Sequence, residues 1–89
     1  MPCAVETTKR FRSAVKGRGA EVARALAQIQ AGFGRPHRHA GLGIRKLAPN
    51  LFECHAGLNL RLVVLARRGV LAFDFAGDHA EVQNYLRWR

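Results

Sequence analysis

Four ionisable side chains could together carry proton-transfer chemistry beside an anion: Glu53, His55, Arg61 and His79. Histidines and carboxylates transfer protons, and a guanidinium stabilises developing negative charge. His79 falls in the first turn of an expected C-terminal helix, where the positive helix end disfavours an imidazolium ion and free backbone amides can hold a phosphate. A surface histidine beside a helix cap is the ordinary alternative for this residue.

The strands expected around these residues place three of them on one sheet face. Alternating apolar positions bounded by turn residues predict three strands, over residues 51–56, 60–66 and 70–75. Their connections are too short for parallel crossovers, so the strands form an antiparallel meander. Burial of Cys54 against Leu62 across the first hairpin then sets His55 directly opposite Arg61, with Glu53 on the same face.

The second hairpin extends both faces of this sheet. A two-residue turn at Arg68-Gly69 pairs Leu62 with Phe75 in the core and leaves Asp74 on the polar face, across from Val63. An ion pair of the strand arginine with Asp74, or with the glutamate of the first strand, would be the purely structural explanation of this polar face. The convergence of several ionisable groups beside a helix start favours a functional site.

Helices are expected on both sides of the meander. A short basic helix over residues 8–16 precedes a helix over residues 20–31, whose apolar residues follow the 3.6-residue period. Near the C-terminus, Asp78 and Glu81 have the spacing of a capping box, so a helix starts at about residue 79. The sequence predicts an α+β fold, with two N-terminal helices packed on the meander and a short C-terminal helix, in one domain of residues 1–89.

The charge of the chain indicates an anionic partner. The formal net charge is +9, and residues 1–50 contain ten of the 15 Lys and Arg but two of the six acidic residues. This imbalance favours nucleic acid or an acidic protein over a membrane surface. No apolar run is long enough to span a bilayer, and the N-terminus lacks a secretory pattern, so we expect no membrane partner and a cytoplasmic protein.

Cysteine and histidine spacing gives little support for a metal or a disulfide. Cys54 alternates with apolar neighbours and is expected to be a free, buried thiol. His37 and His39 could ligate zinc with Cys54 or His55, but one His-x-His pair without a second spaced pair is a weak pattern. We expect no metal and no small-molecule cofactor.

Four short segments resemble the RelE/ParE superfamily of toxins from type II toxin-antitoxin systems. They are Gly43-Ile44-Arg45-Lys46-Leu47, Leu51-Phe52-Glu53-Cys54-His55, Leu60-Arg61-Leu62-Val63-Val64 and His79-Ala80-Glu81-Val82. The resemblance follows the element order over about residues 20–86. It implies a compact, RelE-like, microbial RNase-like fold, a cognate antitoxin and, for the RelE branch, endonucleolytic cleavage of mRNA on the ribosome that inhibits translation.

The resemblance also implies roles for individual residues. Arg61 matches the family's strand arginine that contacts the reacting phosphate, and His79 falls where several ribosome-dependent members have a catalytic histidine. Glu53 and His55 stand where the RelE type has two lysines, and Gln83 stands where it has a tyrosine. These departures favour a histidine-based variant of the mechanism over one identical to that of RelE.

We therefore expect metal-independent attack of a 2′-hydroxyl on phosphate, with His55 or Glu53 as base, His79 as acid and Arg61 as charge stabiliser. Contacts to the RNA backbone are expected from Arg45 and Lys46. Docking on ribosomal RNA is expected from residues 10–18 and 35–39, which include Arg12, Lys16, Arg35 and Arg38. The alternatives are a non-catalytic ParE-type toxin that binds DNA gyrase and a small RNA-binding regulatory module.

Overall fold

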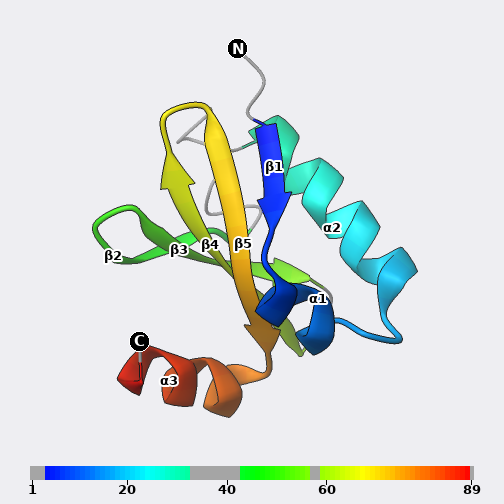
Figure 1. Cartoon of the computed structure of the whole chain (residues 1–89), viewed down its shortest axis with the longest axis vertical. Helices are drawn as coiled ribbons and strands as arrows, with labels where there is room; N and C mark the ends of the chain where they lie inside the picture. The colour runs from blue at the N-terminus through cyan, green and yellow to red at the C-terminus, as the bar shows by residue number, and fades with distance from the viewer. Residues whose placement is uncertain (1–3, 33–42, 57–58, 89) are drawn as a thin grey trace.

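A computed structural model describes residues 4–32, 43–56 and 59–88. Its five strands form one sheet in the order β1-β5-β4-β3-β2, and three helices accompany it (Figure 1). The strands are β1 (Ala4–Thr7), β2 (Arg45–Ala48), β3 (Leu51–Ala56), β4 (Leu60–Arg67) and β5 (Val70–Gly77). The helices are α1 (Lys9–Ala14), α2 (Gly19–Gly32) and α3 (His79–Arg87).

The predicted antiparallel meander is confirmed as β3, β4 and β5. Two further strands extend it. β2 pairs antiparallel with β3, and β1 pairs with β5 in the parallel direction, so the sheet is mixed at one edge. Each of these added strands has four residues, which is too short for an alternating pattern to stand out in the sequence.

The register of the first hairpin is as predicted, and that of the second is as predicted from the turn to the pair Val64–Phe73 and differs beyond it. Cys54 pairs with Leu62, and His55 pairs with Arg61. Between β4 and β5 the register shifts, because Val63 pairs with Phe75 and Val64 pairs with Phe73, which leaves Asp74 as an extra residue. The predicted pairing of Leu62 with Phe75 and the placing of Asp74 across from Val63 are therefore wrong, and Leu62 faces Ala76. A bulge of this kind re-aims the residues that follow it.

The larger core lies between the sheet and the first two helices. Phe11 of α1 contacts Phe73 with ring centroids 5.6 Å apart, and α2 contributes Val22, Ala25 and Ile29. Cys54 is fully buried in this cluster. Burial, together with the neighbouring Glu53 carboxylate, raises the pKa of the Cys54 thiol to about 12. The expectation of a free, buried thiol at Cys54 is confirmed.

The opposite face of the sheet carries α3, which packs there in a second, smaller cluster (Figure 1). Val82 of α3 is fully buried in a smaller cluster with Leu51 and Val63. Phe75, brought to this face by the bulge, stacks on Tyr85 with a 4.8 Å centroid separation. The predicted capping box is present, since Asp78 accepts from the amide of Glu81 and Glu81 accepts from that of Asp78.

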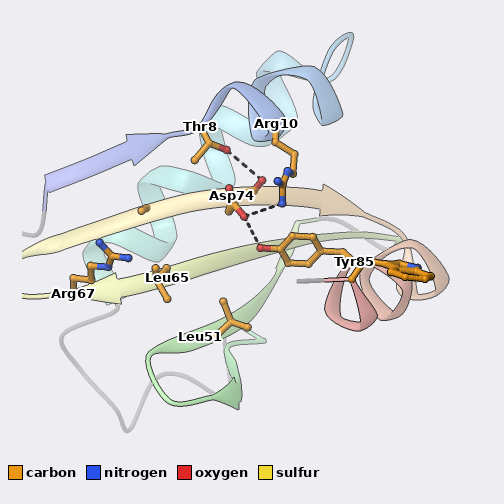
Figure 2. Close-up of a pocket in the computed structure, with 9 residues that line it drawn as sticks. Thr8, Arg10, Leu51, Leu65, Arg67, Asp74 and Tyr85 are labelled. Carbon is orange, nitrogen blue, oxygen red and sulfur yellow. Dashed lines mark hydrogen bonds and ion pairs between the residues drawn. The ribbon is translucent and has the colours of Figure 1, made fainter.

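The bulged residue Asp74 ties three elements together. Its carboxylate accepts hydrogen bonds from Tyr85 of α3 at 2.5 Å and from Arg10 of α1 at 3.4 Å, and its carbonyl accepts from Thr8 (Figure 2). Thr8 in turn caps α1. The contacts tie the second half of α3 to β5 and to α1.

Among the described residues, no helix is both long enough and apolar enough to cross a membrane.

Candidate active site

Arg61 of β4 is the centre of the candidate site. Its Nη1 atom donates to Oε1 of Glu53 at 3.2 Å and lies 2.7 Å from Nδ1 of His79. The side chain of Arg61 is 26% exposed, so its guanidinium is anchored and still reachable from solvent. The expected meeting of the strand arginine with the histidine that begins the last helix is observed.

Strand pairing explains why these two residues meet. Arg61 is the register partner of Gly77, the last residue of β5, and α3 begins two residues later with His79. The bulge at Asp74 creates this register, because the predicted pairing would have set Arg61 opposite Ala76. Gly77 also leaves room for the helix start, since a Cβ atom there would come within 2.8 Å of the Cβ atom of Glu81.

The contact between Arg61 and His79 defines the tautomer of the imidazole. A guanidinium has donors and no acceptor, so Nδ1 of His79 must accept the hydrogen bond. The neutral ring then carries its proton on Nε2. A protonated His79 cannot make this bond, because both of its ring nitrogens are donors. In this geometry Arg61 is therefore the donor and Nδ1 of His79 the acceptor.

Glu53 is a buried anion beneath three basic side chains. Its side chain is 2% exposed, with Arg61 at 3.2 Å and His55 Nε2 at 3.7 Å from Oε1, and Arg45 at 3.9 Å from Oε2. The Oε2 atom is buried without a hydrogen-bond partner among the described residues. The carboxylate is positioned to orient the cations above it and is poorly placed to reach a ligand itself.

His55 lies beside this carboxylate and is much more accessible, with half of its side chain exposed. The backbone of Gly43 packs against its ring. A Cβ atom at Gly43 would lie 2.9 Å from Cγ and 3.1 Å from Nδ1 of the imidazole, and the φ angle of +68° at this glycine is also unfavourable for other residues. The absence of a side chain at Gly43 therefore helps to set where the imidazole sits.

Two hollows flank Arg61. The first, here the β3 hollow, has a volume of about 350 Å³ and is lined by Gly43, Ile44, Arg45, Glu53, His55 and Arg61. The second, here the α3 hollow, has a volume of about 540 Å³ and is lined by Arg18, Asn59, Arg61, Asp78, His79, Ala80 and Glu81. The four predicted catalytic residues are thus gathered around one guanidinium that both hollows share.

The predicted RNA-binding residues are more scattered. Arg45 and Lys46 are exposed on β2, and Arg45 lines the β3 hollow. Arg12 is exposed on α1 and donates to Thr7 at 2.7 Å, and Lys16 is exposed just after that helix. The other predicted positions, Arg35, Arg38, His37 and His39, lie outside the described residues.

Sequence reasoning missed the roles of three residues in this site. Asn59 and the carboxylate of Asp78 line the α3 hollow, and Gly43 limits the space around His55. Asp78 was recognisable as a helix cap and Gly43 as part of a turn. The spacing of these residues does not reveal that they also face the reactive groups, because their proximity depends on the register of β4 and β5.

Comparison with protein-family models and with curated protein sequences finds no match. Solved structures give clear similarities. The toxin in the Escherichia coli DinJ-YafQ complex matches with a TM-score of 0.67 and 15% identity over 90% of this chain and 97% of that chain. YafQ from Escherichia coli strain BL21(DE3) matches with a TM-score of 0.64 and 16% identity, over the same shares of the two chains.

A protein from Helicobacter pylori, HP0892, has a TM-score of 0.61 and 20% identity, over 90% of this chain and 98% of that chain. At these identities the similarity establishes the fold. The predicted RelE-like α+β fold is confirmed, with the addition of the parallel strand β1 and of β2.

Proposed function

We propose that this chain is the toxin of a type II toxin-antitoxin pair and a ribosome-dependent mRNA endonuclease. The observation that carries the proposal is the 2.7 Å contact between Arg61 and His79, a phosphate-binding cation beside a proton-transfer group. Two further features support it: the fold shared with YafQ, which is found in a toxin-antitoxin complex, and the net charge of +9.

His55 is the better candidate for the base that removes the proton from the 2′-hydroxyl. Half of its side chain is exposed and it lines the β3 hollow, whereas Glu53 is buried under Arg61. We assign Glu53 the role of orienting Arg61 and His55. Attack of the 2′-oxygen on phosphorus forms one P–O bond, and departure of the 5′-oxygen breaks another.

His79 would act as the acid only after Arg61 turns to the phosphate. In the free protein Nδ1 of His79 accepts from Arg61. When the guanidinium hydrogen-bonds to the phosphate oxygens, Nδ1 is released and can bind a proton from solvent. The charged imidazole then protonates the leaving 5′-oxygen. In this scheme the guanidinium of Arg61 couples substrate binding to the protonation of His79.

The basic surface would bring the site to its substrate. Three basic side chains are exposed, Arg12 on α1, Lys16 just after that helix and Lys46 on β2, and they can contact ribosomal RNA and mRNA backbones. Such contacts predict binding that weakens steeply as salt is raised. A cognate antitoxin, of which DinJ in complex with YafQ is an example, would block these surfaces in the cytoplasm until it is removed.

The test is translation of a defined message with purified ribosomes and purified protein. We expect cleavage by the wild-type chain, and losses of about 100-fold or more for His79→Ala and Arg61→Ala, because each removes a group acting in the transition state. Gln28→Ala is a matched control, an exposed α2 residue outside both hollows. A message left intact by the wild-type chain would contradict the proposal. Inhibition of DNA supercoiling by gyrase in place of message cleavage would contradict it as well.

A further inference from the structure

The two hollows beside Arg61 differ in the chemistry of their linings. Around the β3 hollow, Arg45, Arg61 and His55 surround one carboxylate, which already accepts a hydrogen bond from Arg61. The lining is basic and suits the sugar-phosphate backbone on one side of the scissile phosphate. Around the α3 hollow, two arginines stand with the two carboxylates of Asp78 and Glu81. The two acids offset the charge of the two arginines, so this lining suits a neutral polar group better than a second phosphate.

The α3 hollow instead presents the groups that bind nucleobase edges. Arg18 donates hydrogen bonds, Asp78 accepts them, and the amide of Asn59 does both. These side chains come from the segment between α1 and α2, the residue directly before β4 and the start of α3, so they come together from three parts of the chain. The volume of about 540 Å³ lies in the range of small-molecule pockets.

The capping box holds the acceptor in place. Oδ1 of Asp78 accepts from the amide of Glu81 at 2.8 Å, and the amide of Asp78 donates to Glu81 at 2.9 Å. One oxygen of Asp78 is therefore engaged, and in the described part of the chain the box leaves Oδ2 available to a ligand. An acceptor fixed in this way recognises a donor without losing side-chain freedom on binding.

We propose that the α3 hollow is a base-recognition pocket for the nucleotide next to the scissile phosphate, with Asp78 as its specificity-determining residue. The inference rests on the proposed endonuclease function and adds its substrate preference. Asp78 accepts from the amino group of guanine, adenine or cytosine. Guanine fits best, because a second donor lies beside its amino group on the Watson–Crick edge, whereas the amino group of adenine or cytosine has an acceptor beside it that would face the carboxylate. Uracil is disfavoured, because carbonyl oxygens flank its only donor and face the carboxylate.

The substitution Asp78→Asn isolates this role. Asparagine is as good a helix cap as aspartate, so Oδ1 can still accept from the amide of Glu81 and α3 is expected to remain folded. At the recognition edge, the Oδ2 acceptor becomes an amide donor. The variant should therefore donate a hydrogen bond to a carbonyl oxygen of uracil and lose its preference for amino-bearing bases. Glu6→Gln removes a charge from β1, away from both hollows, and is the matched control.

The experiment measures cleavage of a message library, varied at one codon, on ribosomes. For the wild-type chain we expect cleavage next to guanine to exceed cleavage next to uracil, and Asp78→Asn to lower that ratio roughly 5- to 100-fold, the worth of one good base contact. Glu6→Gln should leave the ratio unchanged. An unchanged ratio in Asp78→Asn, whatever its total rate, would overturn the pocket while leaving the nuclease intact.

A binding measurement separates failure of the pocket from failure of the proposed function. NMR titrations with guanosine 5′-monophosphate and uridine 5′-monophosphate report on the Asn59 amide and the His79 ring without any turnover. Larger chemical-shift changes with the guanosine nucleotide than with the uridine nucleotide would support the pocket, if the order of the two is reversed in Asp78→Asn. This support would hold even if no message were cleaved. Equal responses to both nucleotides would refute it.

Discussion

Replacing Gly43 by alanine should displace the imidazole of His55 while the fold survives. Gly43 has a φ angle of +68°, and a Cβ atom there would lie 2.9 Å from Cγ and 3.0 Å from Cβ of His55. Ordinary carbon contacts are about 3.5–4.0 Å, so the ring must move by roughly 0.5–1 Å. Gly69→Ala is the matched control, because Gly69 has the same φ angle and nothing within 4 Å of the added atom.

The two variants should lose similar stability and very different activity. A left-handed conformation costs an L-residue about 1–2 kcal/mol, and the stiffer unfolded chain offsets about 0.4–1 kcal/mol of this. Both variants should then unfold roughly 5 °C earlier in a thermal melt. A displacement of about 1 Å in a catalytic base can cost roughly 100-fold in rate. We expect that loss for Gly43→Ala and little loss for Gly69→Ala.

The measurements are thermal unfolding, message cleavage on ribosomes and the NMR signals of the His55 ring. The ring signals should shift in Gly43→Ala and remain in place in Gly69→Ala. Equal activity of the two variants at equal stability would refute the view that the bare backbone at Gly43 positions His55. A large activity loss without any shift of the His55 ring would refute it as well.

Three further changes test the supports of the site. Tyr85→Phe removes the hydrogen bond to Asp74 and should lower stability by about 1–2 kcal/mol, with faster amide exchange in α3. Glu53→Gln weakens the anchor of Arg61 and should lower the catalytic rate more than the affinity for message. The pKa of the Cys54 thiol is raised from 9.0 to about 12 in the folded protein, so the thiol ionises at lower pH in the unfolded chain than in the folded one. The contribution of Cys54 to the free energy of unfolding is therefore lost as pH rises from 9 to 12. The stability difference between the wild type and Cys54→Ala should therefore narrow by about 2 kcal/mol between pH 8.5 and 10.5, by chemical denaturation.

Each of these has an outcome that contradicts it. Unchanged exchange in α3 would show that Tyr85 does not hold the helix. If Glu53→Gln lowered the affinity for message and the catalytic rate equally, the carboxylate would not have the orienting role that we assign to it. A stability difference at Cys54 that is constant with pH would mean that the buried thiol does not couple ionisation to unfolding.

Much of the site was predictable because burial determines register. Cys54 and Leu62 must both face the core, and this alone sets His55 opposite Arg61. The residues that start α3 were also recognisable, since Asp78 and Glu81 have the spacing of a capping box. Local patterns therefore predicted the strand arginine and the helix histidine at neighbouring ends of their elements.

The bulge in β5 was not predictable, and it determines that Arg61 pairs with Gly77 and so lies beside His79. Asp74 is the extra residue, and its carboxylate is satisfied by Arg10 and Tyr85, which are distant in sequence. A local pattern does not show such partners. The same limit applies to β1, whose four residues become a strand by pairing with β5. It applies also to Gly43, whose contact with His55 arises from the folded arrangement of β2 and β3.

The chemistry of the cut ends tests the central claim most directly. If His55, Arg61 and His79 promote attack of the 2′-hydroxyl, message cleaved on ribosomes must carry a 2′,3′-cyclic phosphate on the upstream fragment and a free 5′-hydroxyl on the downstream one. Mass spectrometry of the fragments from the wild-type chain should show both ends, and the products should disappear with His79→Ala. Fragments with 5′-phosphate ends, or undiminished cleavage by that variant, would contradict the account.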